Sequence, residues 1–352
     1  MKKEIISIFF AATPFHIICL NELYSRDKSI NHELILLLRR KNDFANKQIY
    51  LTMDKLGFKD YTLFWIPKIR IFRFLAEMIL VFQIKYKHKD KEKLFTIYDF
   101  RDSFMQSLRR FFRKANFTLI DDGFSTYVAQ EKYMSKNIYL PIERYDNISG
   151  FITKWLYFGF DFNRLKHSPF KIFTIYGDEI KDRLVEFNRL VELRRILKNL
   201  NGSLAKNKVF YAGSGMAERG VITIEEEMEL VVFINEYWKR RGKTMYYVAK
   251  KSTSNKKLQV FKENDIKTLR FDLPLEIALT EIDELPSDIC ANGSTLLKSI
   301  PLIFDKKITC HYIDVKEYFM NNSKSFSQMK FNDVMDVSTN YIKNSPNIKK
   351  IF

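Results

Sequence analysis

The sequence predicts an α/β protein with two doubly wound domains, each built around a parallel sheet. Short runs of apolar, strand-forming residues alternate with longer segments suited to helices, and the alternation starts again near residue 208. The chain has 352 residues, which is more than one hydrophobic core usually holds. We therefore expect two Rossmann-like domains that face a central cleft.

The composition indicates a globular protein with a preference for anionic partners. Its 59 lysines and arginines outnumber the 42 acidic residues, and the net charge of +17 favours phosphorylated substrates, anionic lipid headgroups or nucleic acid. The basic residues are spread along the chain and form no recognisable nucleic-acid module, so we do not expect nucleic acid as a partner.

The cysteines and the apolar runs indicate a cytoplasmic location. Cys19, Cys290 and Cys310 lack the spacing of metal ligands, which fits a reducing compartment. Residues 5–10 form too short an apolar run for a signal peptide, and no run approaches the ~18 to 20 apolar residues that span a bilayer.

The first half begins with a strand over residues 5–12, a tight turn and a helix over about residues 17–24. Thr13 is a suitable N-cap, and Pro14 suits the first helical position. The turn exposes backbone N–H groups, so Thr13, Pro14 and His16 are candidates for binding an acceptor or nucleotide. His16 has a second interpretation, a turn histidine whose nitrogens bond to the backbone. Further strands are predicted at 33–38, 61–66, 93–98 and 117–120.

The strand at 117–120 continues directly into Asp121, Asp122 and Gly123. Open α/β sheets keep their active sites at the carboxyl ends of their strands, where the glycine permits a turn with positive φ. Gly123 is therefore a further candidate for contacting the acceptor or substrate. Adjacent carboxylates raise each other's pKa, which helps one of them to act as a general base near neutral pH. The pattern leaves open which aspartate is the base. It also leaves open an Asp-Asp-Gly surface turn without chemistry.

Residues 68–93 mix large apolar residues with lysines and arginines. One interpretation is an amphipathic helix that touches an anionic membrane. The other is a partly buried helix with a solvated lysine tail, because the apolar residues occupy more than one face.

The middle of the chain contains the predicted domain boundary. A strand at 171–176 precedes a charged helix over about 180–200, which ends at Asn201-Gly202-Ser203. The predicted domains are therefore an acceptor-side domain over residues 1–203 and a nucleotide-sugar-binding domain over residues 204–330. A helical tail over residues 331–352 follows them.

The second half repeats the alternation of strands and helices. Helices are predicted over about 224–240, in a short segment after residue 274, and from Leu296 onward. Strands are predicted at 208–212, 244–249, 268–271, 287–291, 300–304 and 308–313.

Several of these strands end in groups that suit phosphate binding, and two of the loops contain glycine and hydroxyl groups beside a predicted helix start. A lysine pair there can neutralise a phosphate, and a glutamate can bind a ribose. Taken singly, each is also an ordinary turn, a solvated loop or a helix-start glutamate. The candidates are Gly213, Ser214, Gly215, Lys250, Lys251, Glu276, Ser294 and Thr295.

The order of these motifs resembles the bacterial sialyltransferases, namely the lipooligosaccharide enzymes of glycosyltransferase family 52 and the capsular polysialyltransferases. The shared series is Thr-Pro-Phe-His, Asp-Asp-Gly, a glycine-containing strand end, Pro-x-Glu and Ser-Thr. The resemblance implies a GT-B fold and metal-independent, inverting transfer from CMP-N-acetylneuraminate. It also implies that Asp121 or Asp122 deprotonates the acceptor, that Glu276 holds the CMP ribose, and that Ser294 and Thr295 hold the phosphate.

One departure from the family concerns the leaving phosphate. The family has a His-Pro pair after a strand, where this chain has Lys250 and Lys251, and none of its five histidines precedes a proline. A lysine supplies charge to the phosphate but is a poor proton donor near neutral pH. The departure leaves other donors open, such as another CMP-activated nonulosonate, CMP-Kdo or a non-CMP sugar.

The resulting hypothesis is a cytoplasmic enzyme with no cofactor, which binds a nucleotide-sugar donor and a cell-surface glycan or glycolipid. Lys250 joins the aspartates as a catalytic candidate, and the anionic inner membrane is a further partner. The alternatives are a GT-B transferase with another donor, an inactive GT-B protein, and a basic protein that binds anions or membranes without catalysis.

Overall fold

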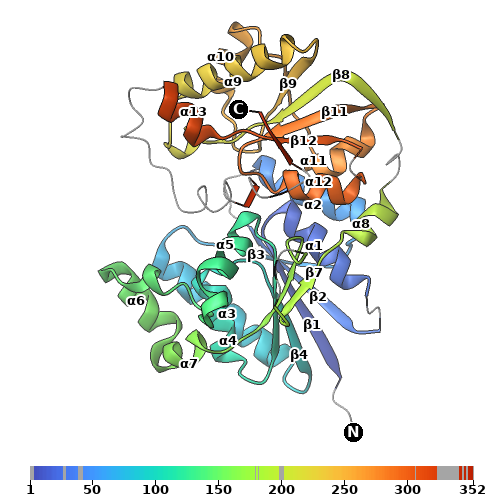
Figure 1. The fold of residues 1–352 in the computed structure, drawn as a ribbon. Helices are drawn as coiled ribbons and strands as arrows, with labels where there is room; N and C mark the ends of the chain where they lie inside the picture. The colour runs from blue at the N-terminus through green and yellow to red at the C-terminus, as the bar shows by residue number, and fades with distance from the viewer. Residues whose placement is uncertain are drawn as a thin grey trace. The chain divides into compact units, whose positions relative to one another are not determined.

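The computed structural model describes residues 4–26, 29–38, 43–178, 180, 182–197, 202–305, 307–322, 341–342, 345 and 348–351. It forms two compact units, Met1–Leu193 and Arg194–Phe352 (Figure 1). The division lies ten residues before the predicted boundary, inside the short helix α8 (Val191–Ile196). It falls there because the carboxylate of Glu22 accepts hydrogen bonds from the backbone N–H groups of Glu192 and Leu193, which fixes the start of α8 to unit 1.

Unit 1 contains a seven-stranded, entirely parallel sheet in the order β3-β2-β1-β4-β5-β6-β7. The strands are β1 (Ile5–Ala11), β2 (Asn31–Leu38), β3 (Thr62–Trp65), β4 (Glu92–Ile97), β5 (Asn116–Ile120), β6 (Lys171–Thr174) and β7 (Val185–Phe187). The helices besides α8 are α1 (Pro14–Tyr24), α2 (Asp43–Leu56), α3 (Arg70–Lys87), α4 (Ser103–Phe111), α5 (Phe124–Lys132), α6 (Ile148–Tyr157) and α7 (Phe162–Lys166). The central strands are continuous apolar runs because helices cover both faces of the sheet (Figure 1).

Unit 2 contains a second parallel sheet, in the order β10-β9-β8-β11-β12-β13. Its strands are β8 (Ser203–Ala212), β9 (Thr244–Val248), β10 (Thr268–Leu269), β11 (Glu284–Ala291), β12 (Thr309–Tyr312) and β13 (Ile348–Lys350). Its helices are α9 (Ile224–Lys239), α10 (Asn255–Glu263), α11 (Leu275–Ala278), α12 (Leu296–Ile303) and α13 (Val315–Asn322). A capping box between Thr223 and Glu226 starts α9, whose buried residues, such as Leu230 and Ile234, pack into the unit's core.

Two sequence-based element predictions are wrong. The helix expected over 180–200 is instead β7, which pairs with β6, followed by α8; Leu190 has a φ of 52°, which breaks a helix there. The strand expected over 300–304 belongs largely to α12, because Leu297, Ile300 and Ile303 are buried at helical spacing. The helical tail expected over 331–352 is corrected at its end, where Ile348–Lys350 forms the strand β13; Tyr341 and Ile342 are helical, and the rest of the helix expected near 331–342 lies outside the described residues.

The other strands predicted from the sequence are confirmed, as is the α1 start at Thr13 and Pro14. Within the described part of the chain, every helix is too short or too polar to cross a bilayer.

Candidate active site

Three polar segments meet at the carboxyl edge of the unit 1 sheet. β4 lies between β1 and β5, with Phe9 paired to Thr96 and Ile97 paired to Leu119. The residues that follow these strands therefore emerge side by side. They include the turn before α1, the Tyr98-Asp99 segment after β4, and the Asp121-Asp122-Gly123 segment after β5.

His16 and Asp122 form a pair across this edge. Nε2 of His16 lies 3.1 Å from Oδ1 of Asp122, and Nδ1 accepts a hydrogen bond from the backbone N–H of Ala12 at 3.1 Å. Because Nδ1 is an acceptor, the ring proton is on Nε2 and is donated to the aspartate. His16 is buried and stacks on Tyr98 with ring centroids 4.4 Å apart, so the donor is held in one orientation.

The two adjacent aspartates have different surroundings. The side chain of Asp122 is 30% exposed, and its backbone N–H donates to Oγ1 of Thr126. Asp121 is fully buried, and it accepts hydrogen bonds from Oγ1 of Thr174 at 2.6 Å and from the backbone N–H of Ile175 at 2.8 Å. Burial raises the pKa of Asp121 to about 7. Asp121 thus joins the ends of β5 and β6, and Asp122 is the carboxylate that a substrate can reach.

Gly123 is required by the backbone at this turn. Its φ of 63° and ψ of −146° lie in a region that is essentially restricted to glycine, and α5 begins at the next residue. The turn at Thr13 is more regular, since its side chain accepts a hydrogen bond from the backbone N–H of His16 and Pro14 opens α1.

Asp99 is a third carboxylate at this edge and was missed by the sequence reasoning. Burial and the charge of Asp122 raise its pKa, and its Oδ1 accepts a hydrogen bond from the backbone N–H of Arg101. The available signal was an acid directly after a buried strand, the same pattern that pointed to Asp121 and Asp122.

Unit 2 gathers its polar loops at the carboxyl edge of its own sheet. Ala212 at the end of β8 pairs with Val248 of β9 on one side and with Ala291 of β11 on the other. The loops Gly213–Gly215, Lys250–Lys251 and 292–295 therefore follow three adjacent strands.

The Gly213–Gly215 loop is fixed by close packing and by a buried carboxylate. A Cβ at Gly213 would lie 2.3 Å from the hydroxyl oxygen of buried Tyr247, so only glycine fits there. The hydroxyl of Ser214 donates to Glu227 at 2.8 Å. Gly215 has a φ of 64° and its carbonyl accepts a hydrogen bond from Arg219.

Cations surround this loop. Nζ of Lys250 donates to the carbonyl oxygen of Ser214 at 3.5 Å, and Lys257 forms buried ion pairs with Glu227 at 2.7 Å and Glu218 at 3.2 Å. Burial, together with the charge of Arg219, lowers the pKa of Lys250 to about 8. Lys251 is exposed. Sequence reasoning missed Arg219, Glu227 and Lys257, which carry no local signal because they look like ordinary helix-surface charges.

The Pro-x-Glu and Ser-Thr segments come together through their helices. Glu276, on α11, is buried and accepts a hydrogen bond from the hydroxyl of Ser299 on α12 at 3.1 Å; burial raises its pKa. Ser294 and Thr295 are half-buried immediately before α12, and Oγ of Ser294 accepts a hydrogen bond from the backbone N–H of Leu296.

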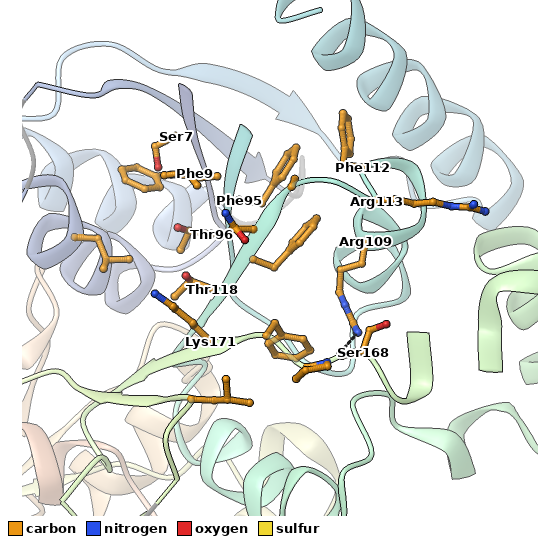
Figure 2. Close-up of a pocket in the computed structure, with 18 of the residues that line it drawn as sticks. Ser7, Phe9, Phe95, Thr96, Arg109, Phe112, Arg113, Thr118, Ser168 and Lys171 are labelled. Atoms are coloured by element: carbon orange, nitrogen blue, oxygen red, sulfur yellow. Dashed lines mark hydrogen bonds between the residues drawn. The ribbon is translucent and has the colours of Figure 1, made fainter. Parts of the chain in front are cut away.

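A separate cavity of about 550 Å³ lies toward the amino ends of β5 and β6 and contains none of the predicted site residues (Figure 2). Its buried cation, Arg109, donates hydrogen bonds to the backbone carbonyls of Tyr139, Leu165 and Ser168. The guanidinium is therefore used in holding the surrounding loops.

Comparisons with known proteins identify the fold. No family model and no curated protein matches the sequence. A UDP-GlcNAc 2-epimerase from Methanocaldococcus jannaschii matches with a TM-score of 0.52 and 13% identity, over 97% of this chain and 94% of that one. LpCGTa, solved in complex with UDP, matches with a TM-score of 0.53 and 10% identity, over 99% of this chain and 85% of that one. These proteins have the GT-B fold, and at such low identity the likeness shows that the chain shares this fold.

Proposed function

We propose that the chain is an inverting, metal-independent glycosyltransferase that moves N-acetylneuraminate from CMP-N-acetylneuraminate to a hydroxyl of a glycan or glycolipid. The observation that carries the proposal is the Asp122–His16 pair, a partly exposed carboxylate held in place by a buried imidazole at the carboxyl edge of a parallel sheet.

Asp122 acts as the general base in this mechanism. The acceptor oxygen forms a bond to the anomeric carbon of the donor, the bond from that carbon to the CMP phosphate breaks, and the acceptor proton passes to Asp122. His16 donates from Nε2 throughout, so it orients the carboxylate and takes no part in proton transfer. Asp121 is a positioning residue that fixes the turn.

The unit 2 loops hold the nucleotide in this mechanism. The ammonium of Lys250 and the backbone N–H groups of the glycine-containing loops stabilise the charge that develops on the leaving phosphate. The contact between Glu276 and Ser299 supports a shared nucleotide site for the Pro-x-Glu and Ser-Thr segments, since it brings their helices together. The structural neighbours named above include one solved with UDP, so uridine donors are the main alternative.

The nucleotide specificity is tested by thermal-shift measurements with CMP, CDP, UDP, GDP and TDP in the presence of EDTA. We expect a concentration-dependent rise in Tm with cytidine nucleotides, because a ligand that binds only the folded state stabilises it by mass action. A rise in Tm with UDP, GDP or TDP alone would mean that the donor sugar is activated by that nucleotide and not by CMP. No rise with any nucleotide would favour the non-enzymatic anion-binding alternative.

The base is tested by comparing two substitutions. Asp122→Asn should reduce kcat by about 10² to 10⁴-fold, which is the usual contribution of a general base, and should leave CMP binding and Tm nearly unchanged. Asp121→Asn should lower Tm, because the buried amide cannot accept hydrogen bonds at both of its terminal atoms. An Asp122→Asn variant with near wild-type kcat would exclude this residue as the base.

A further inference from the structure

The helix α3 has an apolar stripe on its solvent side. Its buried residues, such as Leu80 and Val81, face the unit 1 core, but a second set at spacings of three and four residues is exposed. Ile79 is 58% exposed and Phe82 is 67% exposed. The stripe consists of Phe72, Leu75, Ile79, Phe82 and Tyr86, and Ile71 beside Phe72 is also exposed. A regular outward stripe of large apolar side chains marks an interaction surface.

The helix α6 adds its own exposed apolar residues beside α3. Its outward residues, with one that follows it, are Ile148, Phe151, Ile152, Trp155 and Phe160. The two helices are joined by firm contacts: Arg70 donates to Oγ of Ser149 at 2.7 Å, and the hydroxyl of Tyr157 donates to the buried carboxylate of Glu77. The ring of Phe74 also packs edge-on against Tyr157. The exposed residues therefore form one preformed surface, which we term the α3–α6 surface.

The charge around the α3–α6 surface is positive. Glu77 is the only acid in α3, where it is buried and paired with Arg73, and α6 has no acid. A hollow of about 790 Å³ adjoins α3 at Lys85, and its lining includes Asp161, which follows Phe160 in the chain. Its charged lining consists of Lys85, Lys89, Lys91, Lys93, Arg110, Arg113, Lys114, Glu92 and Asp161.

We propose that the α3–α6 surface docks onto an anionic lipid bilayer, with its apolar side chains at the level of the acyl boundary and the basic hollow against lipid phosphates. Interfacial helices that bind membranes combine apolar residues with lysine and arginine in this way. A second copy of the chain is a poorer occupant, because symmetric pairing would bring lysines of the two copies together. The proposal is independent of the donor and the base.

The experiment is sedimentation of the purified full-length chain with vesicles of phosphatidylcholine, with or without phosphatidylglycerol. We expect binding that needs the anionic lipid and falls with added salt. The double substitution Ile79→Ser/Phe82→Ser should weaken binding by about tenfold or more, from the apolar area it removes from the bilayer. Lys85→Gln/Lys89→Gln should also weaken binding to the anionic vesicles by about tenfold.

Matched controls come from unit 2. Leu204→Ser/Met320→Ser removes exposed apolar side chains elsewhere, and Lys239→Gln/Lys256→Gln removes exposed charge elsewhere, so both should bind vesicles like wild type. An unchanged Tm confirms that each variant is folded. Absence of wild-type binding to anionic vesicles would overturn the proposal, as would an Ile79→Ser/Phe82→Ser variant that binds normally. A wild-type dimer in sedimentation velocity that this variant abolishes, without vesicle binding, would instead identify a second copy as the occupant.

Discussion

Lys250 lies among charges of both signs at the end of β9. Arg219 and Lys257 disfavour its ammonium form, and Glu218 and Glu227 favour it, but burial dominates and lowers its pKa to about 8. A lysine in this state is about half neutral at pH 8. A bound phosphate restores the charged form, so nucleotide binding and protonation of Lys250 are linked.

We therefore predict that CMP binding takes up a proton near pH 8 and weakens as the pH rises from 8 to 9. CMP itself does not contribute, because a phosphate monoester with a second pKa of about 6 is fully ionised there. Calorimetric titrations in buffers of different ionisation enthalpy measure the uptake. The Lys250→Arg variant should bind CMP without taking up a proton. The Lys251→Gln variant should take up a proton as the wild type does. Uptake that persists in Lys250→Arg would assign the proton to another group.

The pairing of His16 with Asp122 shows what single residues reveal before the fold is known. The Asp-Asp-Gly pattern predicted an acidic turn after a strand, and the structure confirms that placement. The partner of Asp122 was not predictable, because His16 is 106 residues away and approaches only because β1 and β5 both flank β4. The different surroundings of the two aspartates were not predictable either. Asp121 is held by Thr174 and Ile175, which lie beside it because β5 pairs with β6.

At the scale of elements, buried charge holds unit 2 helices to the glycine loop. Lys257 of α10 pairs with Glu227 of α9, and Glu227 in turn accepts hydrogen bonds from Ser214 and from the backbone N–H of Ala217. Both charged side chains are fully buried. Removing one partner leaves the other uncompensated in the interior.

We predict that Lys257→Met lowers the free energy of unfolding by about 3 to 5 kcal/mol. The double variant Lys257→Met/Glu227→Gln should lose less unfolding free energy than the two single variants lose together, because neither charge of the pair then remains without the other. Urea denaturation of the four proteins completes the cycle. Strictly additive values would mean that the ion pair is not coupled. The exposed pair Lys239–Glu236 is the control, since its removal should change stability by less than about 1 kcal/mol.

Element prediction from sequence succeeded where a strand is a continuous apolar run and failed where tertiary contacts decide. The longer strands of both sheets are continuous apolar runs bounded by turn residues, and this pattern identifies them in the sequence. The segment 180–200 is rich in charged residues that favour helices, but Val185–Phe187 completes the edge of the unit 1 sheet instead. The apolar run at 300–304 suits a strand or a helix equally, and its burial against the sheet selects the helix.

At the scale of the whole molecule, each unit has its own sheet and its own buried core. We predict two calorimetric unfolding transitions, of which CMP raises only the one that belongs to unit 2. Lys257→Met should lower that same transition, and Asp121→Asn should lower the other. A nucleotide that raises both transitions equally would indicate that the units unfold together.

The strand order of unit 1 also has a consequence for folding kinetics. Phe9 in β1 pairs with Leu34 of β2 and with Thr96 of β4, so the central strand gains its second neighbour from a distant part of the sequence. Parallel sheets with such non-local pairings form slowly, and until they close they expose an apolar strand edge that can pair with other chains. Refolding yield should therefore fall as protein concentration rises, because the β1 edge can pair with another molecule before β4 has covered it.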